Sequence, residues 1–278
     1  MFEIIILGVI QGLTEFLPVS SSAHLVISER LFNLHLPGLS IEVTLHLASL
    51  LALIYYFNTE LWDILIKTIK YVVYKTNHYS KYYYTSLFLI TATLTTALTG
   101  IGIEFLLDEK IKSITLTGLG LIFTGVLLII MEKSVRSQFI FLKQEQDLNI
   151  RDGILIGICQ GISVIPGISR SGFTIVSGIF SGYSKETAVK LSFLLAFPVI
   201  IGSFLYQVPE LISGINSTAQ IQNNEFPNKI ELIAAFITSF VASLVSIKGL
   251  ISLVKRQRLT LFAIYVFSLG LLAIISDI

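Results

Sequence analysis

Long uninterrupted apolar runs constrain this chain more than any other feature of its sequence. A helix needs roughly 20 apolar residues to cross about 30 Å of hydrocarbon. Hydrophobic residues make up 54% of the 278 residues and charged residues only 13%, about half the charged share of a soluble globular protein. The sequence therefore predicts an all-α integral membrane protein, with spans at 39–57, 83–106, 113–131, 186–206, 229–253 and 259–275.

Charge, cysteine content and the first residues bear on nucleic-acid binding, disulfides and a signal peptide. The net charge of +1 gives no electrostatic basis for binding nucleic acid. The single cysteine, Cys159, has no partner for an internal disulfide. Because the residues before Glu3 carry no basic segment and Pro18 interrupts the apolar stretch, we do not expect a cleaved signal peptide.

Two segments of the chain repeat each other. Residues 8–21 read GVIQGLTEFLPVSS and residues 157–169 read GICQGISVIPGIS, so that Gly8 aligns with Gly157 and Gln11 with Gln160. Later spans keep nearly the same spacing, since 83 and 229, like 113 and 259, lie 146 residues apart. A period that is held over half a chain indicates duplication.

Each half begins with a broken apolar element, at 1–33 and at 150–181. Its two stretches of about 12 to 16 residues are too short to cross separately, which predicts a re-entrant helix-loop-helix. A hairpin plus three spans is an odd number of crossings, so the second half should lie inverted, with both breaks near the midplane. The expected organisation is a first repeat at 1–131, a cytoplasmic linker at 132–149 and a second repeat at 150–278.

Basic residues are distributed unequally between the two sides of this predicted topology. One side has little beyond Arg30, Lys110, Lys112 and Lys229. The positive-inside rule therefore places the richer side in the cytoplasm and opens the first hairpin to the external face of the cell membrane. The richer side carries Lys67, Lys70, Lys75, Lys81, Lys133, Arg136, Lys143, Arg151, Lys185, Lys255, Arg256 and Arg258.

Polar residues of the first break share one helix face. Gln11 and Glu15 are four residues apart, and an ionisable side chain at membrane depth usually lines a cavity. The alternative is a glutamate that extends to the interface from a short helix. Pro18 ends the first helix, and a serine cluster suits the start of the second, where free N–H groups attract anions. That cluster is Ser20, Ser21 and Ser22.

His24 follows Ser21 by three residues, near enough on a helix to exchange a proton with its hydroxyl. The alternative is a core histidine behind a run of capping serines. The second break adds Arg170 between Ser169 and Ser171, a planar cation suited to phosphate. Arg170 is either buried and directed at a ligand or extended to the cytoplasmic surface. Face to face, the two breaks would supply the groups of a phosphate-handling site.

The chain resembles the undecaprenyl-diphosphatases of the bacitracin-resistance type. The resemblance rests on QGLTEFLPVSSSAH at 11–24, PGISRSGFT at 166–174 and SFLLAFP at 192–198, and the span layout extends it to nearly the whole chain. It implies hydrolysis of a polyprenyl (undecaprenyl) diphosphate to the monophosphate and inorganic phosphate, which recycles a lipid carrier. It also implies a divalent cation, Mg²⁺ or Ca²⁺.

The resemblance assigns roles that the residues alone leave open. The family has Glu or Gln at the position of Gln11, so Glu15 is the one carboxylate and metal ligand of the pair here, and the diphosphate should supply most other ligands. Ser21 is the candidate nucleophile, with Glu15 or His24 as its base, and attack by an activated water is the alternative. The expected catalytic residues are Glu15, Ser21, His24 and Arg170, and the expected substrate-binding residues are Gln11, Ser20, Ser22, Gly167, Ser169, Ser171 and Thr174.

Other functions remain compatible with this pattern. Inverted repeats with broken helices also build secondary transporters, so an anion transporter is the main alternative. Flipping of the monophosphate carrier could accompany hydrolysis. The expected partners are the lipid substrate and membrane lipids, and the sequence leaves a homodimer open.

Overall fold

The computed structural model describes residues 1–32, 40–107, 113–136, 143–217, 229–256 and 259–276. These residues form helices joined by short connections, with one isolated parallel bridge between Lys143 and Tyr183. The α-helices are α1 (Phe2–Thr14), α2 (Ser21–Leu31), α3 (Ser40–Tyr56), α4 (Asn58–Tyr74), α5 (Ser80–Leu107), α6 (Ile114–Arg136), α7 (Ile150–Ile162), α8 (Arg170–Phe180), α9 (Lys185–Ser217), α10 (Lys229–Arg256) and α11 (Thr260–Ser276), and short 3₁₀ turns are η1 (Asn77–Tyr79) and η3 (Glu145–Asp147).

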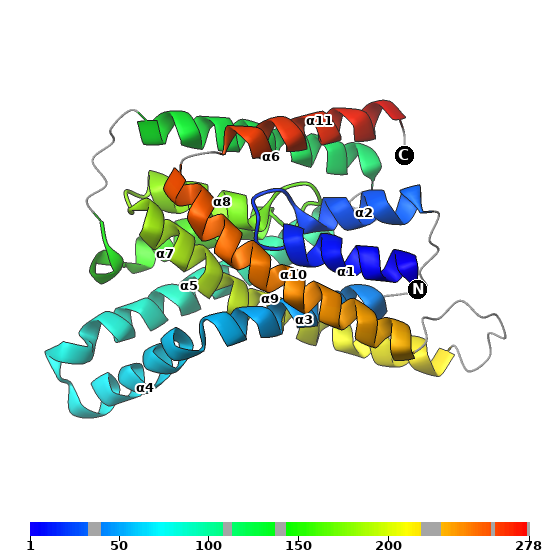
Figure 1. Cartoon of the computed structure of the whole chain (residues 1–278). Coiled ribbons are helices and arrows are strands. Elements are labelled where there is room, and N and C mark those ends of the chain that lie inside the picture. Colours follow the sequence, from blue (N-terminus) through cyan, green and yellow to red (C-terminus); the bar gives the residue numbers. More distant parts are fainter. Residues whose placement is uncertain (33–39, 108–112, 137–142, 218–228, 257–258, 277–278) are drawn as a thin grey trace.

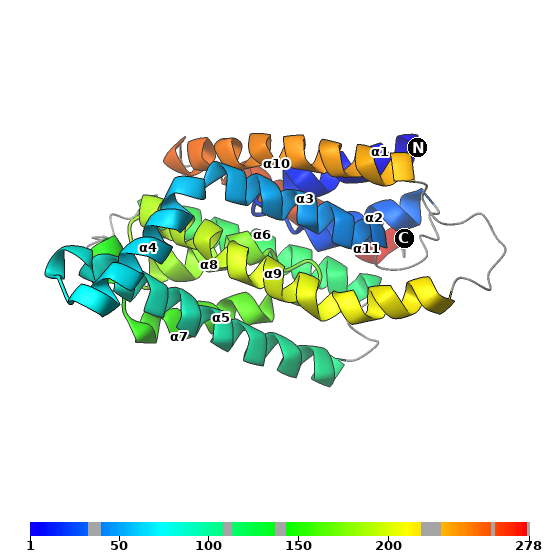
Figure 2. The same cartoon turned by 90° about the horizontal axis from the view of Figure 1, so that it is seen from below.

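The long helices lie alongside one another in a bundle (Figures 1 and 2). We call the end where α1 begins and α11 ends the terminal end, and the opposite end, where α6 ends and α7 begins, the linker end. α1 and α2 form a hairpin that enters from the terminal end and turns back, whereas α7 and α8 enter from the linker end (Figure 1). The two turns, at 15–20 and 163–169, both fall inside the bundle.

Four of the described helices are long and apolar enough to cross a membrane: α5, α6, α9 and α10. α3 and α4 are bent by 72° and would add a fifth span as a pair, while α11 is apolar but shorter. The protein is thus a multi-pass, all-helical membrane protein by the length and composition of its helices. Each of the six expected ranges lies on a helix, although their ends shift; among the expected residues, 33, 39, 110, 112, 137–142 and 258 lie outside the described part of the chain.

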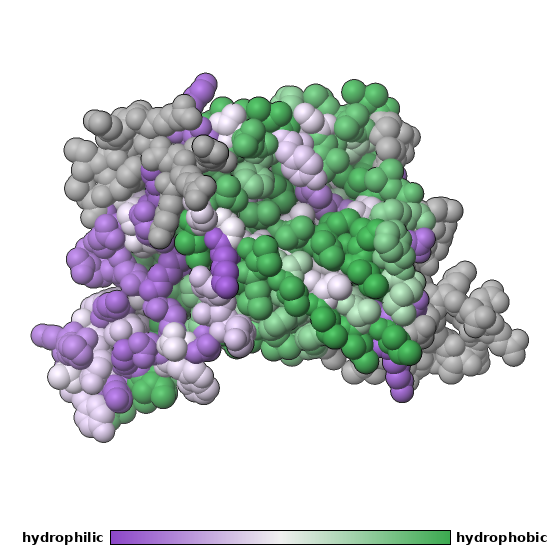
Figure 3. Space-filling view, viewed as in Figure 1, coloured by the Kyte–Doolittle hydropathy of each residue, from purple (hydrophilic) through white to green (hydrophobic). Residues whose placement is uncertain are grey.

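α4 is a helix that the apolar-run analysis did not predict. Asp63, Lys67 and Lys70 interrupt its hydrophobicity, so no apolar run is visible, but Trp62 and Ile69 lie on a stripe that remains exposed. Figure 3 shows hydrophilic residues gathered over the linker end, at the left of the view, and a broad apolar surface over the middle of the bundle. This distribution matches a protein whose middle is surrounded by lipid.

Close helix contacts hold the two hairpins in the bundle. α1 packs on α10, where a Cβ on Gly12 would clash with the backbone of Ser239, and α7 packs on α5, where a Cβ on Gly157 would clash with Ala92. The first turn is anchored by Phe16, which is buried in the largest hydrophobic cluster. Glycines on α1 and α7 therefore permit the approach that brings both turns into the interior.

Candidate active site

Glu15 lies at the C-terminal end of α1 and collects donors from both turns. Its Oε1 accepts a hydrogen bond from Arg170 Nη2 at 2.6 Å, and its Oε2 accepts from Ser21 Oγ at 2.7 Å and Gln11 Nε2 at 2.8 Å. His46 Nε2, from α3, lies 3.8 Å from the same Oε2. Glu15 is only 8% exposed, and a buried carboxylate is tolerated when it is paired and hydrogen-bonded in this way.

Arg170 is the first residue of α8 and reaches Glu15 across the interface between the two turns. Its side chain is 16% exposed and partly buried, and it points to Glu15 inside the bundle. Because Ser21 and Arg170 both begin helices, the carboxylate faces two helix N-termini that can bind anions. The structure therefore brings Gln11, Glu15, Ser21 and Arg170 into one cluster.

Hydrogen bonds also join the two turns directly. Ser20 Oγ accepts from the Gly167 backbone N–H at 3.1 Å, and Ser171 Oγ donates to the Leu17 carbonyl at 2.9 Å. Gly167 has a φ of +94°, a conformation that favours glycine. The Ser20 and Ser22 hydroxyls lie 3.2 Å apart. Several residues that were expected to bind substrate thus form the hydrogen bonds that hold the two turns together.

The hydroxyls of Ser169 and Thr174 hold α8 in place. Ser169 Oγ accepts from the Gly172 N–H as the N-cap of α8. Thr174 Oγ1 lies 2.7 Å from Ser192 Oγ on α9, and both side chains are buried. We expect Ser169 to face an anion mainly through the helix start that it caps.

His24 lies on α2 with both ring nitrogens engaged. Nδ1 is 2.7 Å from the Ser20 carbonyl oxygen, and Nε2 is 2.7 Å from the hydroxyl of Tyr265 on α11. The expected contact with Ser21 is not among the hydrogen bonds of the ring, because Ser21 Oγ donates to Glu15 instead. The Glu15 carboxylate, and not the His24 ring, thus accepts the hydrogen bond of the Ser21 hydroxyl in this structure.

Oxygen ligands for a cation are few at this cluster. Within the described ranges, no group of three or more His, Cys, Asp or Glu residues could hold a metal ion. Among the residues that the structure describes, Gln11 Oε1 is buried without a hydrogen-bond partner, as is Gln160 Oε1 of the second half. Together with the Glu15 carboxylate, the Gln11 amide oxygen suits Mg²⁺ or Ca²⁺, provided that other oxygens complete the shell.

Comparison with known proteins decides the family. Residues 4–272 match the family described as "Bacitracin resistance protein BacA". This chain belongs to the BacA family.

Named relatives of this BacA-family chain are similar over almost their full length. "Undecaprenyl-diphosphatase 1" of Shouchella clausii is 39% identical over 277 residues, covering 99% of this chain and 96% of the relative. "Undecaprenyl-diphosphatase 2" of Halalkalibacterium halodurans is 38% identical over 272 residues, covering 98% and 94%. "Undecaprenyl-diphosphatase" of Alkaliphilus metalliredigens is 31% identical over 286 residues, covering 100% and 98%.

Two residues that support this candidate site were missed by sequence reasoning. Thr124, buried on α6, donates to the Gly167 carbonyl at 2.8 Å and accepts from the Ser169 N–H at 3.0 Å, so it holds the second turn. Tyr265 contacts His24. Each is one of a few polar residues in a largely apolar helix, and only the fold shows which partner it reaches.

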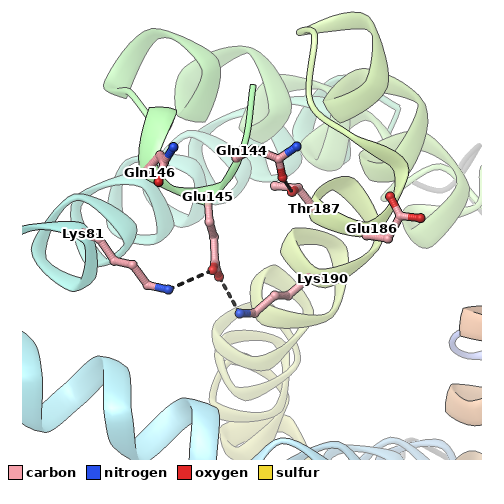
Figure 4. A pocket seen from close by; sticks show the side chains of 7 residues that line it. All are labelled: Lys81, Gln144, Glu145, Gln146, Glu186, Thr187 and Lys190. Atoms are coloured by element: carbon pink, nitrogen blue, oxygen red, sulfur yellow. Dashed lines mark hydrogen bonds and ion pairs between the residues drawn. The ribbon is translucent and has the colours of Figure 1, made fainter. Parts of the chain in front are cut away.

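A separate polar pocket of about 320 Å³ lies at the linker end of this BacA-family protein (Figure 4). Glu145 forms ion pairs there with Lys190 at 2.5 Å and with Lys81 at 3.3 Å. Lys190 also forms an ion pair with Glu60 at 2.7 Å. Partial burial acts to raise the pKa of Glu145, but the two lysines outweigh it and hold that pKa below its usual value. The pocket shares no residue with the Glu15 cluster; it is lined by Lys81, Gln144, Glu145, Gln146, Glu186, Thr187 and Lys190.

Proposed function

We propose that this protein hydrolyses undecaprenyl diphosphate to undecaprenyl monophosphate and inorganic phosphate, and so recycles the lipid carrier of cell-surface polymer synthesis. The observation that carries the proposal is the convergence of Arg170 and the Ser21 hydroxyl on the Glu15 carboxylate. A cation for phosphate, a nucleophile and its base lie together inside an apolar bundle. Membership of the BacA family and the names of its relatives support the same reaction.

The reaction begins when the diphosphate takes Glu15's place beside Arg170. Arg170 and the two helix N-termini hold the phosphates and stabilise the charge of the transferring group. Ser21 Oγ bonds to the terminal phosphorus while the bond from that phosphorus to the bridging oxygen breaks. Glu15 accepts the serine proton and passes it to the departing lipid monophosphate.

Water completes the cycle by attacking the phosphoserine. Its oxygen bonds to phosphorus while the bond from phosphorus to Ser21 Oγ breaks. Glu15 accepts a proton from the water and returns it to Ser21 as inorganic phosphate leaves. The alternative route, in which Glu15 activates water for direct attack, needs the same carboxylate but forms no phosphoenzyme. We favour the serine route because the Ser21 hydroxyl already donates to Glu15 at 2.7 Å.

A divalent cation, Mg²⁺ or Ca²⁺, is part of the proposal. Glu15 and the unpartnered Gln11 Oε1 would hold it together with oxygens of the diphosphate. When bound, the ion would neutralise charge on the diphosphate. The single carboxylate leaves the substrate as the main source of ligands.

We also propose an orientation for the site in the membrane. The hairpin α1–α2 enters from the terminal end and α7–α8 from the linker end, and Gly12 and Gly157 pack their helices against α10 and α5 in matching ways (Figure 1). This supports two inverted repeats, at 1–131 and 150–278. With the basic linker end in the cytoplasm, the lipid is hydrolysed at the external leaflet.

Phosphate release by the purified protein tests the proposed function. Wild type and Arg170→Ala are assayed in detergent with undecaprenyl diphosphate, with added Mg²⁺ or Ca²⁺ and with EDTA. We expect release by wild type, loss of release in EDTA and a collapse in the variant. A folded wild type that releases no phosphate with either metal would reject the proposal and direct attention to anion transport.

A further inference from the structure

Ser20, immediately before Ser21, adopts an unusual backbone conformation. Its φ is +67° and its ψ is +96°, values that residues with a Cβ rarely adopt. Such a conformation persists only where the surroundings hold it. The Ser20 side chain binds Gly167 of the other turn, and its peptide leads directly into Ser21. Whatever holds the Ser20 carbonyl therefore also sets the position of the Ser21 hydroxyl.

His24 is the residue that holds this carbonyl. The Ser20 oxygen accepts from the His24 backbone N–H at 3.3 Å and lies 2.7 Å from the ring Nδ1. A carbonyl oxygen can only accept a hydrogen bond, so Nδ1 must carry the hydrogen. In the neutral ring, Nε2 then has a free lone pair and accepts the hydrogen of the Tyr265 hydroxyl at 2.7 Å.

Tyr265 fixes the ring as well as its tautomer. The two rings are stacked, with centroids 5.6 Å apart and planes 27° apart. Because α11 belongs to the far end of the chain, the last helix supports the turn that begins α2. Both ring nitrogens of His24 are thus bound to groups other than Ser21 and Glu15.

We propose that His24 is a positioning residue, which with Tyr265 holds the strained Ser20 turn, and that it is not the base for Ser21. The inference rests on the proposed function, since the geometry that it protects is that of the Ser21–Glu15 pair. Glu15 is then the one base in contact with the nucleophile. Tyr265 becomes a second positioning residue, which acts on the turn through His24.

Replacement of His24 by Asn or Ala separates positioning from base catalysis. Asn offers an amide N–H near the place of Nδ1 but cannot serve as a base. We expect His24→Asn to retain a substantial part of wild-type kcat, with a pH profile of kcat/KM of unchanged shape, whereas His24→Ala loses most activity. Folded Asn and Ala variants that are equally inactive, or an Asn variant that loses one limb of the profile, would overturn the inference.

Tyr265→Phe tests whether Tyr265 acts on the turn through His24. Loss of one hydrogen bond predicts a decrease in kcat of about 3- to 10-fold in wild type. No further decrease is expected in the His24→Asn background, whose shorter side chain has no atom at the place of Nε2. Tyr84→Phe, at a tyrosine that is equally exposed at 48%, is the control. Equal losses in both backgrounds would show that Tyr265 acts independently of His24.

The tautomer provides a readout that does not depend on activity. Nitrogen-15 NMR of histidine-labelled protein, assigned by the signal that disappears in His24→Asn, should show His24 protonated at Nδ1. Protonation at Nε2 would overturn the inference whether or not the sample releases phosphate. An inactive wild type with the Nδ1–H tautomer would reject the proposed function and leave the support of Ser20 intact.

Discussion

The Arg170 guanidinium donates to Glu15 Oε1 at 2.6 Å, although the two residues are 155 positions apart in the chain. This ion pair closes the contact between two turns that enter the bundle from opposite ends. Its members are also the phosphate ligand and the base of the proposed reaction. Stability and catalysis should therefore respond differently to changes on its two sides.

Arg170→Ala should lower both the stability of the fold and the rate of phosphate release. Removing one partner of a buried pair leaves the Glu15 charge uncompensated, which costs about 3–5 kcal/mol in comparable cases. Loss of a charge-stabilising donor lowers kcat by about 10²- to 10³-fold. Thermal unfolding and phosphate release measure the two effects. In the double variant Arg170→Ala with Glu15→Gln, stability should partly recover while activity does not; recovery of neither would contradict this account of the pair.

Ser21→Ala should abolish the phosphoenzyme. Without a nucleophile the serine route is closed, and we expect kcat to fall on the order of 10³-fold or more. The measurement is acid quenching with a substrate labelled in its terminal phosphate, followed by detection of labelled protein. Ser28→Ala, on the same helix but outside the cluster, serves as the control. Substantial turnover by Ser21→Ala would favour attack by activated water.

Gly12→Ala should destabilise the bundle. The added methyl would meet the backbone of α10, and overpacking typically costs about 1–3 kcal/mol. Gly102→Ala on α5 is the matched control, because its Cβ would meet no atom within 4 Å. The melting temperature in detergent should fall for the first variant and stay unchanged or rise for the second. A similar response of both glycines would show that α1 does not depend on close contact with α10.

Acidification should loosen the linker end. The folded-state pKa of Glu145 is lowered, so its contribution to stability is present above the unfolded pKa of about 4.3 and is lost as pH falls through the folded value. Glu145→Gln should therefore lower the melting temperature at pH 7, and the difference from wild type should shrink as the pH falls below about 4. A difference that stays constant with pH would show that charge at Glu145 is not the cause.

The sequence predicted which side chains of the two breaks meet better than it predicted what supports them. The duplicated motifs around Gln11 and Gln160 predicted two breaks, and the structure brings Glu15, Ser21 and Arg170 of these breaks together. The sequence could not predict that His24 binds Tyr265, because a tyrosine in an apolar helix resembles an interface anchor. Nor could it predict α4, whose exposed stripe alternates with charged residues. Such features depend on helix rotation, which periodicity does not determine.

The separation of Glu15 from its partner in the chain has a consequence for biogenesis. A ribosome completes the first hairpin long before it reaches Arg170, and it reaches Tyr265 later still. During that interval Arg170, the guanidinium that pairs with Glu15 in the complete fold, has not yet been made. The nascent first half must therefore keep Glu15 protonated, hydrated or outside the hydrocarbon until the second hairpin is inserted.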